Sequence, residues 1–330
     1  MDHAFPRSRI LIPGGSGQVG TLLARHFHSK GDEVTVLSRS PVKQPWRTLA
    51  WDARTLGPWA ASLDDADVVI NLAGRTVNCR YNAKNKRDMM DSRVLSTRVL
   101  GQAIAKSPTP PRLWLQASTA TIYAHRFDAA NDEATGIIGG GESGAPKLWD
   151  FSVEIAKAWE RECEGAATPR TRKVLLRSAM TMSPDKGGIF DTLLTLVRRG
   201  LGGTAADGRQ YVSWVHEADF IRAIEFLIAR EDFSGAVNIA SPNPLPNREF
   251  MRELRHAAAA EFGGVGPRLA LPAARWMLAM GALLMRTETE LILKSRRVVP
   301  GRLLGAGFEF AFADWPAAAA DLCRRSNGTA

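Results

Sequence analysis

The chain has 330 residues, which is enough for one large or two modest domains whose core needs no disulfide or metal to hold it together. Hydrophobic residues make up 45% of the sequence and charged residues 23%, which excludes a disordered, collagen-like or coiled-coil protein. The formal net charge of +9 favours anionic ligands, but the basic residues are spread along the chain.

Cysteine usage and hydropathy indicate a reducing compartment and no membrane segment. Cys79, Cys163 and Cys323 lie far apart and form no CxxC pair, as expected of reduced thiols. The N-terminus has no cleavage site of signal-peptide type. The longest apolar stretch, residues 269–285, contains a proline and an arginine and is too short to cross a bilayer. We therefore expect a soluble, cytoplasmic protein with no membrane partner.

Short apolar runs alternate with helix-period stretches in the first half of the chain, a pattern typical of a parallel sheet covered by helices on both faces. The predicted strands are Arg9–Pro13, Glu33–Ser38, Asp67–Asn71, Leu113–Ala117 and Lys173–Arg177, with a further short strand ending near Trp51. The predicted helices are Gly17–Lys30, Lys84–Lys106 and Phe151–Glu164. This order predicts an α/β, Rossmann-type doubly wound sheet.

The pattern changes after Met182, where turn residues interrupt the alternation. We predict a nucleotide-binding domain over residues 1–182, which later segments could join, and a smaller, mostly helical substrate domain over residues 183–330. Its predicted helices are Ala218–Arg230, Asn247–Phe262, Ala273–Arg286 and Trp315–Arg325. Its predicted strands are Tyr211–Val215 and Ala236–Ile239.

A glycine motif follows the first predicted strand and opens the first helix. Its spacing is Gly14-x-x-Gly17-x-x-Gly20, with Gln18 and Val19 inside it. Glycine permits the tight turn, lets a pyrophosphate approach the backbone at Gly17, and lets the helix pack closely at Gly20. The phosphates would then meet the unpaired amide groups and the positive dipole end of the helix. The motif therefore predicts dinucleotide binding, the alternative being a tight turn without a ligand.

The segment after the second predicted strand indicates which dinucleotide binds. An acid is expected there to hold the 2′-hydroxyl of NAD, yet no acid occurs from Val34 through Ala50. Arg39 follows Ser38 instead, so a 2′-phosphate would be accepted where a carboxylate would repel it. We predict NADP(H) over NAD(H), the alternative being a solvated basic loop.

The fourth predicted strand ends in Asn71, Leu72, Ala73 and Gly74. Small residues at the carboxyl edge of such a sheet let the backbone lie against a cofactor. We therefore expect Leu72, Ala73 and Gly74 to contact the dinucleotide, although plain strand-to-loop packing would give the same composition.

These motifs, together with STATIY at residues 118–123, resemble the extended short-chain dehydrogenase/reductase superfamily of epimerase/dehydratase type. Later blocks narrow the resemblance to the YfcH-like atypical epimerase-family proteins, which carry a C-terminal domain of unknown function. These blocks are DSRVLSTRVL at 91–100, GRQYVSWVHEADFIRAI at 208–224, VNIASPNPLPNREF at 237–250 and RVVPGRLLGAGFEF at 297–310. The resemblance covers nearly the whole chain, implies an NAD(P) domain with a substrate domain, and places the family-type C-terminal region at about residues 268–317.

The resemblance also implies catalytic residues. In the superfamily a Ser or Thr after the fifth strand polarises the substrate oxygen, which carries over to Thr119, with its neighbour Ser118 as the fallback. A hydroxyl there can donate to a developing alkoxide. Tyr123 is the nearest tyrosine and a candidate for proton transfer or substrate contact. The alternative is that the hydroxyls of Ser118 and Thr119 only hydrogen-bond to nearby backbone groups at the end of the strand.

The expected Tyr-x-x-x-Lys pair is absent. Four residues beyond the three tyrosines stand Asn85, Phe127 and Val215, and in the helix that should hold the pair its positions fall on Ser152 and Ala156. The residues that could replace it as proton carriers are Tyr123, His125, Glu154, Lys157 and His216. Each of these side chains more commonly has a structural role than a role in proton transfer.

No other chemistry is indicated by the sequence. The six histidines form no HExxH motif, and Thr21 stands where a P-loop needs lysine. Basic residues never extend into a long run and tyrosines are few, so we expect no nucleic-acid partner. We predict an NADP(H)-dependent oxidoreductase or epimerase acting on a small acidic or carbonyl-bearing substrate, with dimerisation left open. The rival is a non-catalytic NADP-binding sensor or scaffold.

Overall fold

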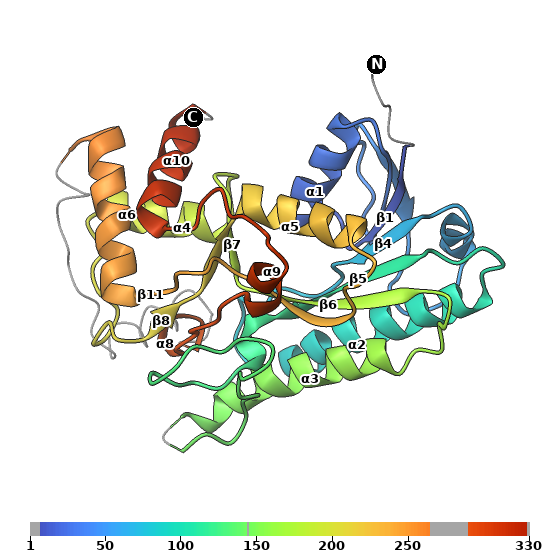
Figure 1. The fold of residues 1–330 in the computed structure, drawn as a ribbon, viewed down its shortest axis with the longest axis horizontal. Helices are drawn as coiled ribbons and strands as arrows, with labels where there is room; N and C mark the ends of the chain where they lie inside the picture. Colours follow the sequence, from blue (N-terminus) through green and yellow to red (C-terminus); the bar gives the residue numbers. More distant parts are fainter. Residues whose placement is uncertain (1–6, 144, 265–289, 329–330) are drawn as a thin grey trace.

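The computed structural model describes residues 7–143, 145–264 and 290–328. A seven-stranded sheet in the order β10-β6-β5-β4-β1-β2-β3 forms the centre of the larger lobe, and every neighbouring pair is parallel (Figure 1). The strands are β1 (Arg9–Pro13), β2 (Glu33–Ser38), β3 (Arg47–Ala50), β4 (Val68–Asn71), β5 (Leu113–Thr119), β6 (Arg172–Ser178) and β10 (Gly235–Ile239). The chain runs outward from β1 in both directions, which creates a switch point at the carboxyl ends of β1 and β4.

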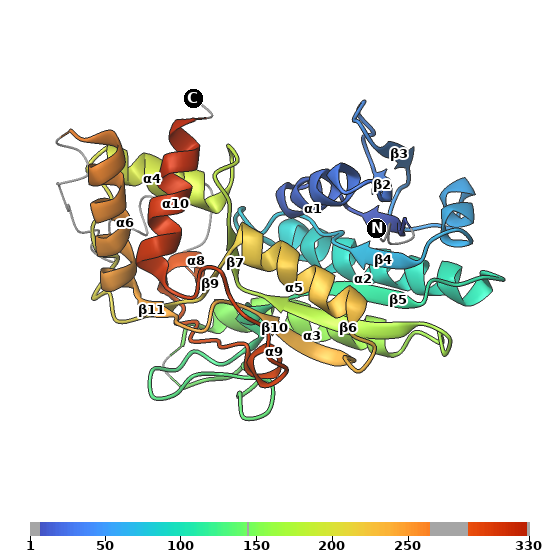
Figure 2. The ribbon, with the colours of Figure 1, turned by 45° about the horizontal axis from the view of Figure 1, so that its top comes forward.

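Both faces of the sheet are buried under helices. Along β1, Ile10 and Ile12 pack on one face with α1 (Gln18–Ser29) and α5 (Glu217–Ala229). Leu11 packs on the other face with α2 (Ala83–Lys106) and α3 (Asp150–Glu164). Because both faces are apolar, the strands are continuous hydrophobic runs, and this is why they could be predicted. Figure 2 shows α5 and α1 on one side of the sheet and α3 on the other.

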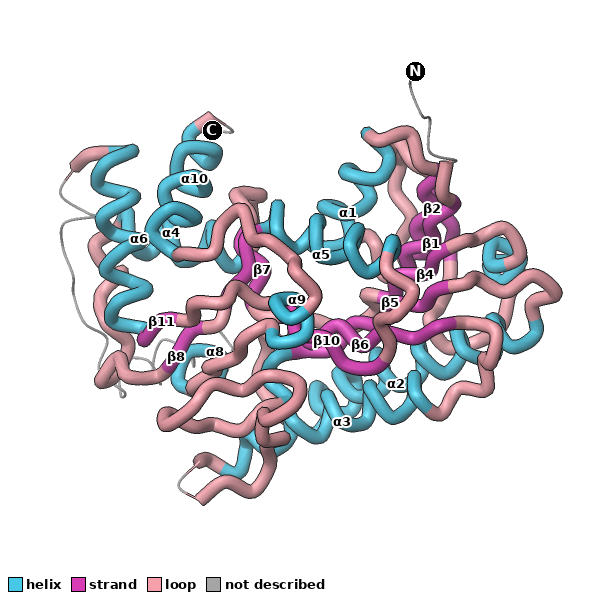
Figure 3. Tube along the Cα trace, in the orientation of Figure 1, coloured by secondary structure: helices cyan, strands magenta, loops and turns pink. Residues whose placement is uncertain are grey.

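The smaller lobe is mostly helical, as Figure 3 shows by colour. Its helices are α4 (Ile189–Arg198), α6 (Asn247–Phe262), α8 (Glu290–Leu293) and α10 (Trp315–Asn327), and α9 (Gly301–Gly305) lies against β10. The short strand pairs are β7 (Met180–Met182) with β9 (Trp214–His216) and β8 (Tyr211–Val212) with β11 (Leu245–Pro246). Three 3-10 turns complete the described elements: η1 (Pro58–Leu63), η2 (Ala120–Ile122) and η3 (Lys147–Trp149). Phe250 stacks on Trp315 at 4.0 Å in the core of this lobe.

The predicted α/β, Rossmann-type fold is confirmed, with three differences in detail. The strand predicted near residues 236–239 is β10, which completes the main sheet, so the larger lobe takes β10 and α5 from beyond residue 182. The strand predicted at Tyr211–Val215 is two strands, because β8 pairs with β11 whereas β9 pairs with β7. The Ser213 side chain between them hydrogen-bonds with the chain at Arg296 and Val298. Helix α4 was not predicted, and the helix predicted at Ala273–Arg286 lies outside the described residues.

Within the described ranges, no helix is both long and apolar enough to span a bilayer.

Candidate functional site

The turn from β1 into α1 contains glycines that have no room for a side chain and one, Gly17, whose backbone is open. Gly14 has φ +75°, and a Cβ there would lie 2.6 Å from the Cα of Ala73. A Cβ on Gly20 would lie 2.4 Å from the Cα of Gly15, so the helix can approach the turn only at glycine. At Gly17 the nearest atom is 3.7 Å away, which leaves that backbone open. Gly17 is also the N-cap of α1 and provides no side-chain cap, so the first helical amides are available to an anion.

Two cavities lie beside this turn and share Leu72. The outer cavity, of about 650 Å³, holds seven of the predicted cofactor residues: Gly14, Gly17, Ser38, Arg39, Leu72, Ala73 and Gly74. The inner cavity, of about 450 Å³, is lined by the predicted Gln18, Val19, Leu72, Ser118 and Thr119, together with side chains from α2, α3 and the segment after α8. The structure thus gathers the predicted cofactor residues at one edge of the sheet, where Gly20 packs against Gly15 of the turn.

The outer cavity carries unpaired positive charge. Arg39 and Arg54 both line it, and neither forms an ion pair with any residue that the structure describes. Asp52 also lines it, but its carboxylate accepts hydrogen bonds from the Arg54 amide at 2.8 Å and from both the amide and hydroxyl of Thr55. These bonds, chiefly that from the Thr55 hydroxyl, lower the pKa of Asp52. Sequence reasoning missed Arg54, whose only signal was its place after the strand that ends near Trp51.

Thr119 lies at the carboxyl end of β5 and lines the inner cavity. Its Oγ1 accepts a hydrogen bond from the Thr121 amide at 3.2 Å and so caps η2. No other side-chain hydrogen bond of Thr119 occurs in the part of the chain that the structure describes, so its hydroxyl hydrogen can donate into the cavity.

Ser118 and Tyr123 belong to a buried network next to the inner cavity. Ser118 donates to Glu160 at 2.6 Å, and Glu160 forms a bidentate ion pair with Arg177 at 2.9 and 2.8 Å. The Tyr123 hydroxyl donates to Asn238 at 2.9 Å and accepts from Arg177 at 3.0 Å. Burial raises the pKa of Tyr123. Ser118 lines the cavity, whereas Tyr123 is not among its lining residues, so the hydroxyl of Tyr123 has a structural role in this arrangement.

The other suggested proton carriers lie outside the inner cavity. The Lys157 ammonium donates to the Gly139 carbonyl at 2.8 Å, and Nδ1 of His125 accepts from the Ser295 amide. His216 caps α5 through Nδ1, and Glu154 is exposed on α3. None of these four side chains lines the inner cavity.

Arg93 of α2 lines the inner cavity and was not predicted. Its guanidinium donates to the Met89 carbonyl at 3.1 Å, lies 5.0 Å from the ring of Trp159, and packs against Gly74. No carboxylate of the described residues pairs with it. Burial lowers the pKa of Arg93 to about 10, so it remains cationic at neutral pH. A cation in this position favours an anionic ligand.

Tyr81 and Ser152 also line the inner cavity and lie next to each other. The Tyr81 hydroxyl lies 3.4 Å from Ser152 Oγ, which in turn lies 2.6 Å from a carboxylate oxygen of Glu290. Arg296 lines the same cavity and donates to Thr121 Oγ1 at 3.0 Å. Ser152 occupies the helix position at which the tyrosine of the absent pair was expected. Sequence reasoning missed Tyr81 and Glu290, because neither is near Ser152 along the chain.

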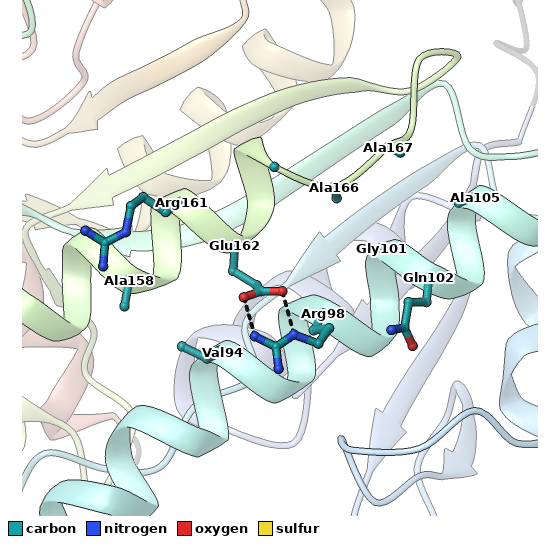
Figure 4. Close-up of a pocket in the computed structure, with 11 residues that line it drawn as sticks. Val94, Arg98, Gly101, Gln102, Ala105, Ala158, Arg161, Glu162, Ala166 and Ala167 are labelled. Atoms are coloured by element: carbon teal, nitrogen blue, oxygen red, sulfur yellow. Dashed lines mark hydrogen bonds and ion pairs between the residues drawn. The ribbon is translucent and has the colours of Figure 1, made fainter.

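A separate hollow lies between α2 and α3, away from the strand ends (Figure 4). It has a volume of about 560 Å³ and is spanned by Arg98 and Glu162, which form two hydrogen bonds of 2.8 Å. None of the predicted site residues lines it. The candidate site is therefore the pair of cavities at the sheet edge.

Comparison with known proteins shows the family and the fold of the chain. Residues 10–139 match the model of the NAD dependent epimerase/dehydratase family, and residues 274–322 match a domain of unknown function, DUF1731. The chain is 31% identical to the epimerase family protein SDR39U1 of Bos taurus over 316 residues, covering 94% of this chain and 98% of that protein. It is 29% identical to the epimerase family protein SERP0438 of Staphylococcus epidermidis, covering 96% and 99%.

Among solved structures, the human epimerase family protein SDR39U1 with NADPH superposes with a TM-score of 0.80 at 27% identity, covering 96% of this chain and 99% of that one. The UDP-N-acetylglucosamine 4-epimerase from Bacillus cereus superposes with a TM-score of 0.73 at 16% identity, covering 97% and 100%, which is a likeness of fold.

Proposed function

The chain belongs to the NAD-dependent epimerase/dehydratase family, and from that premise we propose that it is an NADP(H)-dependent oxidoreductase or epimerase acting on a small acidic, carbonyl-bearing molecule. The observation that carries this proposal is that two cavities, both lined by Leu72, lie beside the glycine turn. A dinucleotide held by the turn would have its adenosine half in the outer cavity and its reactive half toward the inner one.

The residues of the outer cavity fit a dinucleotide. The open backbone at Gly17 and the uncapped start of α1 would hold the pyrophosphate, and the Ala73 and Gly74 backbone would lie against the nucleoside. When bound, the nicotinamide would supply or accept a hydride.

The preference for NADP(H) rests on Arg39 and Arg54. Both guanidinium groups are exposed at the rim of the outer cavity without ion-pair partners in the described chain, and Asp52 has its acceptors occupied by its own turn. A 2′-phosphate would pair with these arginines. The human relative whose structure was solved with NADPH is consistent with this choice.

Calorimetric titration tests this preference. Arg39→Ala and Arg54→Ala are each expected to weaken NADPH binding by about tenfold while leaving NADH binding unchanged. Lys43→Ala is the matched control, because Lys43 is a base of the same loop that does not line the cavity. Equal losses of affinity for NADPH and NADH, or no loss of affinity in either arginine variant, would contradict the assignment of the 2′-phosphate site.

In the inner cavity we assign Thr119 to the orientation of the substrate oxygen and Arg93 to its anionic group. The hydroxyl of Thr119 can donate to an oxygen that gains negative charge during the reaction. Arg93 provides a fixed cation on the neighbouring wall. Ser118 donates its hydrogen to Glu160 and would support Thr119 from behind.

Turnover distinguishes an enzyme from the rival sensor or scaffold, which the missing Tyr-x-x-x-Lys pair favours. The protein is incubated with NADPH and a panel of keto acids, aldehydes, ketones and sugars, and NADPH oxidation is followed. We expect oxidation with a carbonyl-bearing acid, reduced by at least about tenfold in Thr119→Ala. Tight NADPH binding without oxidation by any member of the panel would instead support the non-catalytic role.

A further inference from the structure

A chain of three oxygen-bearing side chains leads from the inner cavity into the protein core. Tyr81 and Ser152 line the cavity, and Glu290 lies behind them with 1% of its surface exposed. The ring of Tyr81 is held edge-on against Phe151 at 5.7 Å, which fixes where the hydroxyl points. We propose that Tyr81, Ser152 and Glu290 form a proton relay in which Tyr81 exchanges the proton with the substrate oxygen, an inference that rests on the proposed function.

The direction of the hydrogen bonds sets the direction of the relay. An ionised carboxylate can only accept, so Ser152 donates its hydrogen to Glu290 at 2.6 Å. Ser152 Oγ is then left as the acceptor for the Tyr81 hydroxyl, 3.4 Å away. In the relay, the Tyr81 oxygen, which lines the cavity, would accept a hydrogen arriving from the substrate. Both side-chain donors, Tyr81 and Ser152, therefore point the same way, from the cavity toward Glu290.

The hydride and proton transfers of the relay balance for the oxidation of a secondary alcohol. The carbinol carbon would give a hydride to an oxidised nicotinamide dinucleotide when one is bound, and the hydroxyl proton would pass to the Tyr81 oxygen. The original Tyr81 proton moves to Ser152, and the original Ser152 proton moves to Glu290. The products are a carbonyl compound, the reduced dinucleotide and a protonated Glu290, and carbonyl reduction runs through the same steps in reverse.

The surroundings suit a relay better than a free tyrosinate base. Burial raises the pKa of Tyr81, so the phenol keeps its proton at rest and passes one on only as another arrives. Thr119 can orient the oxygen but has no comparable route to a carboxylate among its bonds. Tyr123 is bonded to Asn238 and Arg177 outside the cavity lining.

The first test is spectroscopic and needs no substrate. The chain has only three tyrosines, so ring-labelled ¹³C NMR gives three Cζ signals, and Tyr81→Phe identifies the one that belongs to Tyr81. We expect Ser152→Ala to shift this signal and Ser152→Thr to restore it, because threonine returns the hydroxyl. The Tyr123 and Tyr211 signals serve as internal controls. An unchanged Tyr81 signal in Ser152→Ala would show that the two hydroxyls are not bonded, which overturns the relay.

The second test uses the carbonyl panel with NADPH in the full-length protein. Tyr81→Phe is expected to lower kcat by at least about 100-fold, and Ser152→Ala by about tenfold with recovery in Ser152→Thr. The Kd for NADPH stays unchanged in all three variants, which also shows that they fold, and Tyr211→Phe serves as the control. Full activity in Tyr81→Phe would overturn the relay and leave the proposed function standing. Absence of turnover in the wild-type protein would overturn both.

Discussion

Glu160 and Arg177 form the buried ion pair that supports the floor of the inner cavity. The side chains are 8% and 13% exposed, and the pair also holds Ser118 and Tyr123. Burial alone would lower the pKa of Arg177, but Glu160 outweighs this effect and holds the pKa above its ordinary value. The two charges therefore depend on each other for stability.

Glu160→Gln would leave Arg177 buried without its counter-charge. We expect the free energy of unfolding in urea to fall by about 3 kcal/mol. When one partner of a buried pair is neutralised, the other charge stays desolvated without a compensating attraction. Glu162→Gln is the matched control, because its pair with Arg98 is more exposed and should contribute no more than about 1 kcal/mol. Equal losses in the two variants would contradict this description of the pair.

For Arg93 we expect no loss of unfolding free energy on substitution, because it is a cation without a carboxylate partner in the described chain. Arg93→Met keeps the contact with Trp159 and removes a partly buried charge. The free energy of unfolding should stay the same or rise by about 1 kcal/mol. Thermal shifts produced by acidic members of the carbonyl panel should disappear. A large loss of stability with unchanged ligand shifts would mean that Arg93 is a structural residue.

Some of these residues could be recognised from the sequence and others could not. Arg39 and Thr119 stand beside strands whose ends could be located, so their place at the sheet edge followed from the parallel arrangement. Arg93 looks like any arginine on a half-exposed helix, and Tyr81 lies in an irregular segment with no periodic pattern. Only the folded chain brings Tyr81 to Ser152 and Ser152 to Glu290, across separations of 71 and 138 residues.

At the scale of elements, the β1–α1 turn separates two roles of glycine. Gly20→Ala places a methyl group 2.4 Å from the Gly15 Cα, so both stability and NADPH binding should be lost. Gly17→Ala meets nothing closer than 3.7 Å, so the protein without ligand should keep its stability within about 1 kcal/mol. NADPH binding should nevertheless weaken by at least about tenfold, because the methyl group occupies the approach of the pyrophosphate. An unchanged affinity of Gly17→Ala for NADPH would show that the pyrophosphate does not bind at Gly17.

His216 is the N-cap residue of helix α5. Its Nδ1 accepts from the Ala218 amide at 3.1 Å, and its ring stacks on Phe312 at 3.9 Å. The cap requires a neutral ring nitrogen as acceptor. Burial lowers the pKa of His216 from its ordinary 6.5, although the nearby carboxylate of Asp321 opposes this shift. The unfolded chain therefore binds this proton more readily than the folded protein does.

The stability provided by a neutral His216 is complete above pH 6.5 and is lost as the pH falls from there toward the lower pKa of the folded state. His216→Asn keeps a capping oxygen but does not titrate. Between about pH 7 and about pH 5, the wild-type protein should lose more unfolding free energy than the variant. Parallel pH profiles from urea unfolding would show that His216 does not titrate with folding.

At the scale of the whole molecule, the larger lobe was predictable because its strands are buried on both faces and its helices are amphipathic. The predicted bounds of α1, α2, α3 and α6 agree with the structure to within about two residues. The assignment of β10 to the main sheet depends on pairing with β6, which local pattern does not encode. The division of Tyr211–Val215 into two strands depends on distant partners in the same way.

The arrangement of the lobes explains why the site combines predictable and unpredictable parts. Strand ends and the glycine turn provide the outer cavity from the first half of the chain. The inner cavity also takes Met180, Phe220 and Arg296 from later segments that fold back over the sheet edge. The residues of the outer cavity could therefore be found from local motifs, whereas the wall of the inner cavity required the complete tertiary structure.

The central claim is that the glycine turn and the outer cavity hold a dinucleotide with a 2′-phosphate. Calorimetric titration of the purified full-length protein with NADPH and with NADH tests it most directly. We predict one NADPH bound per chain, with an affinity at least about tenfold higher than that for NADH. The absence of binding heat with either nucleotide, at several temperatures, would contradict the account.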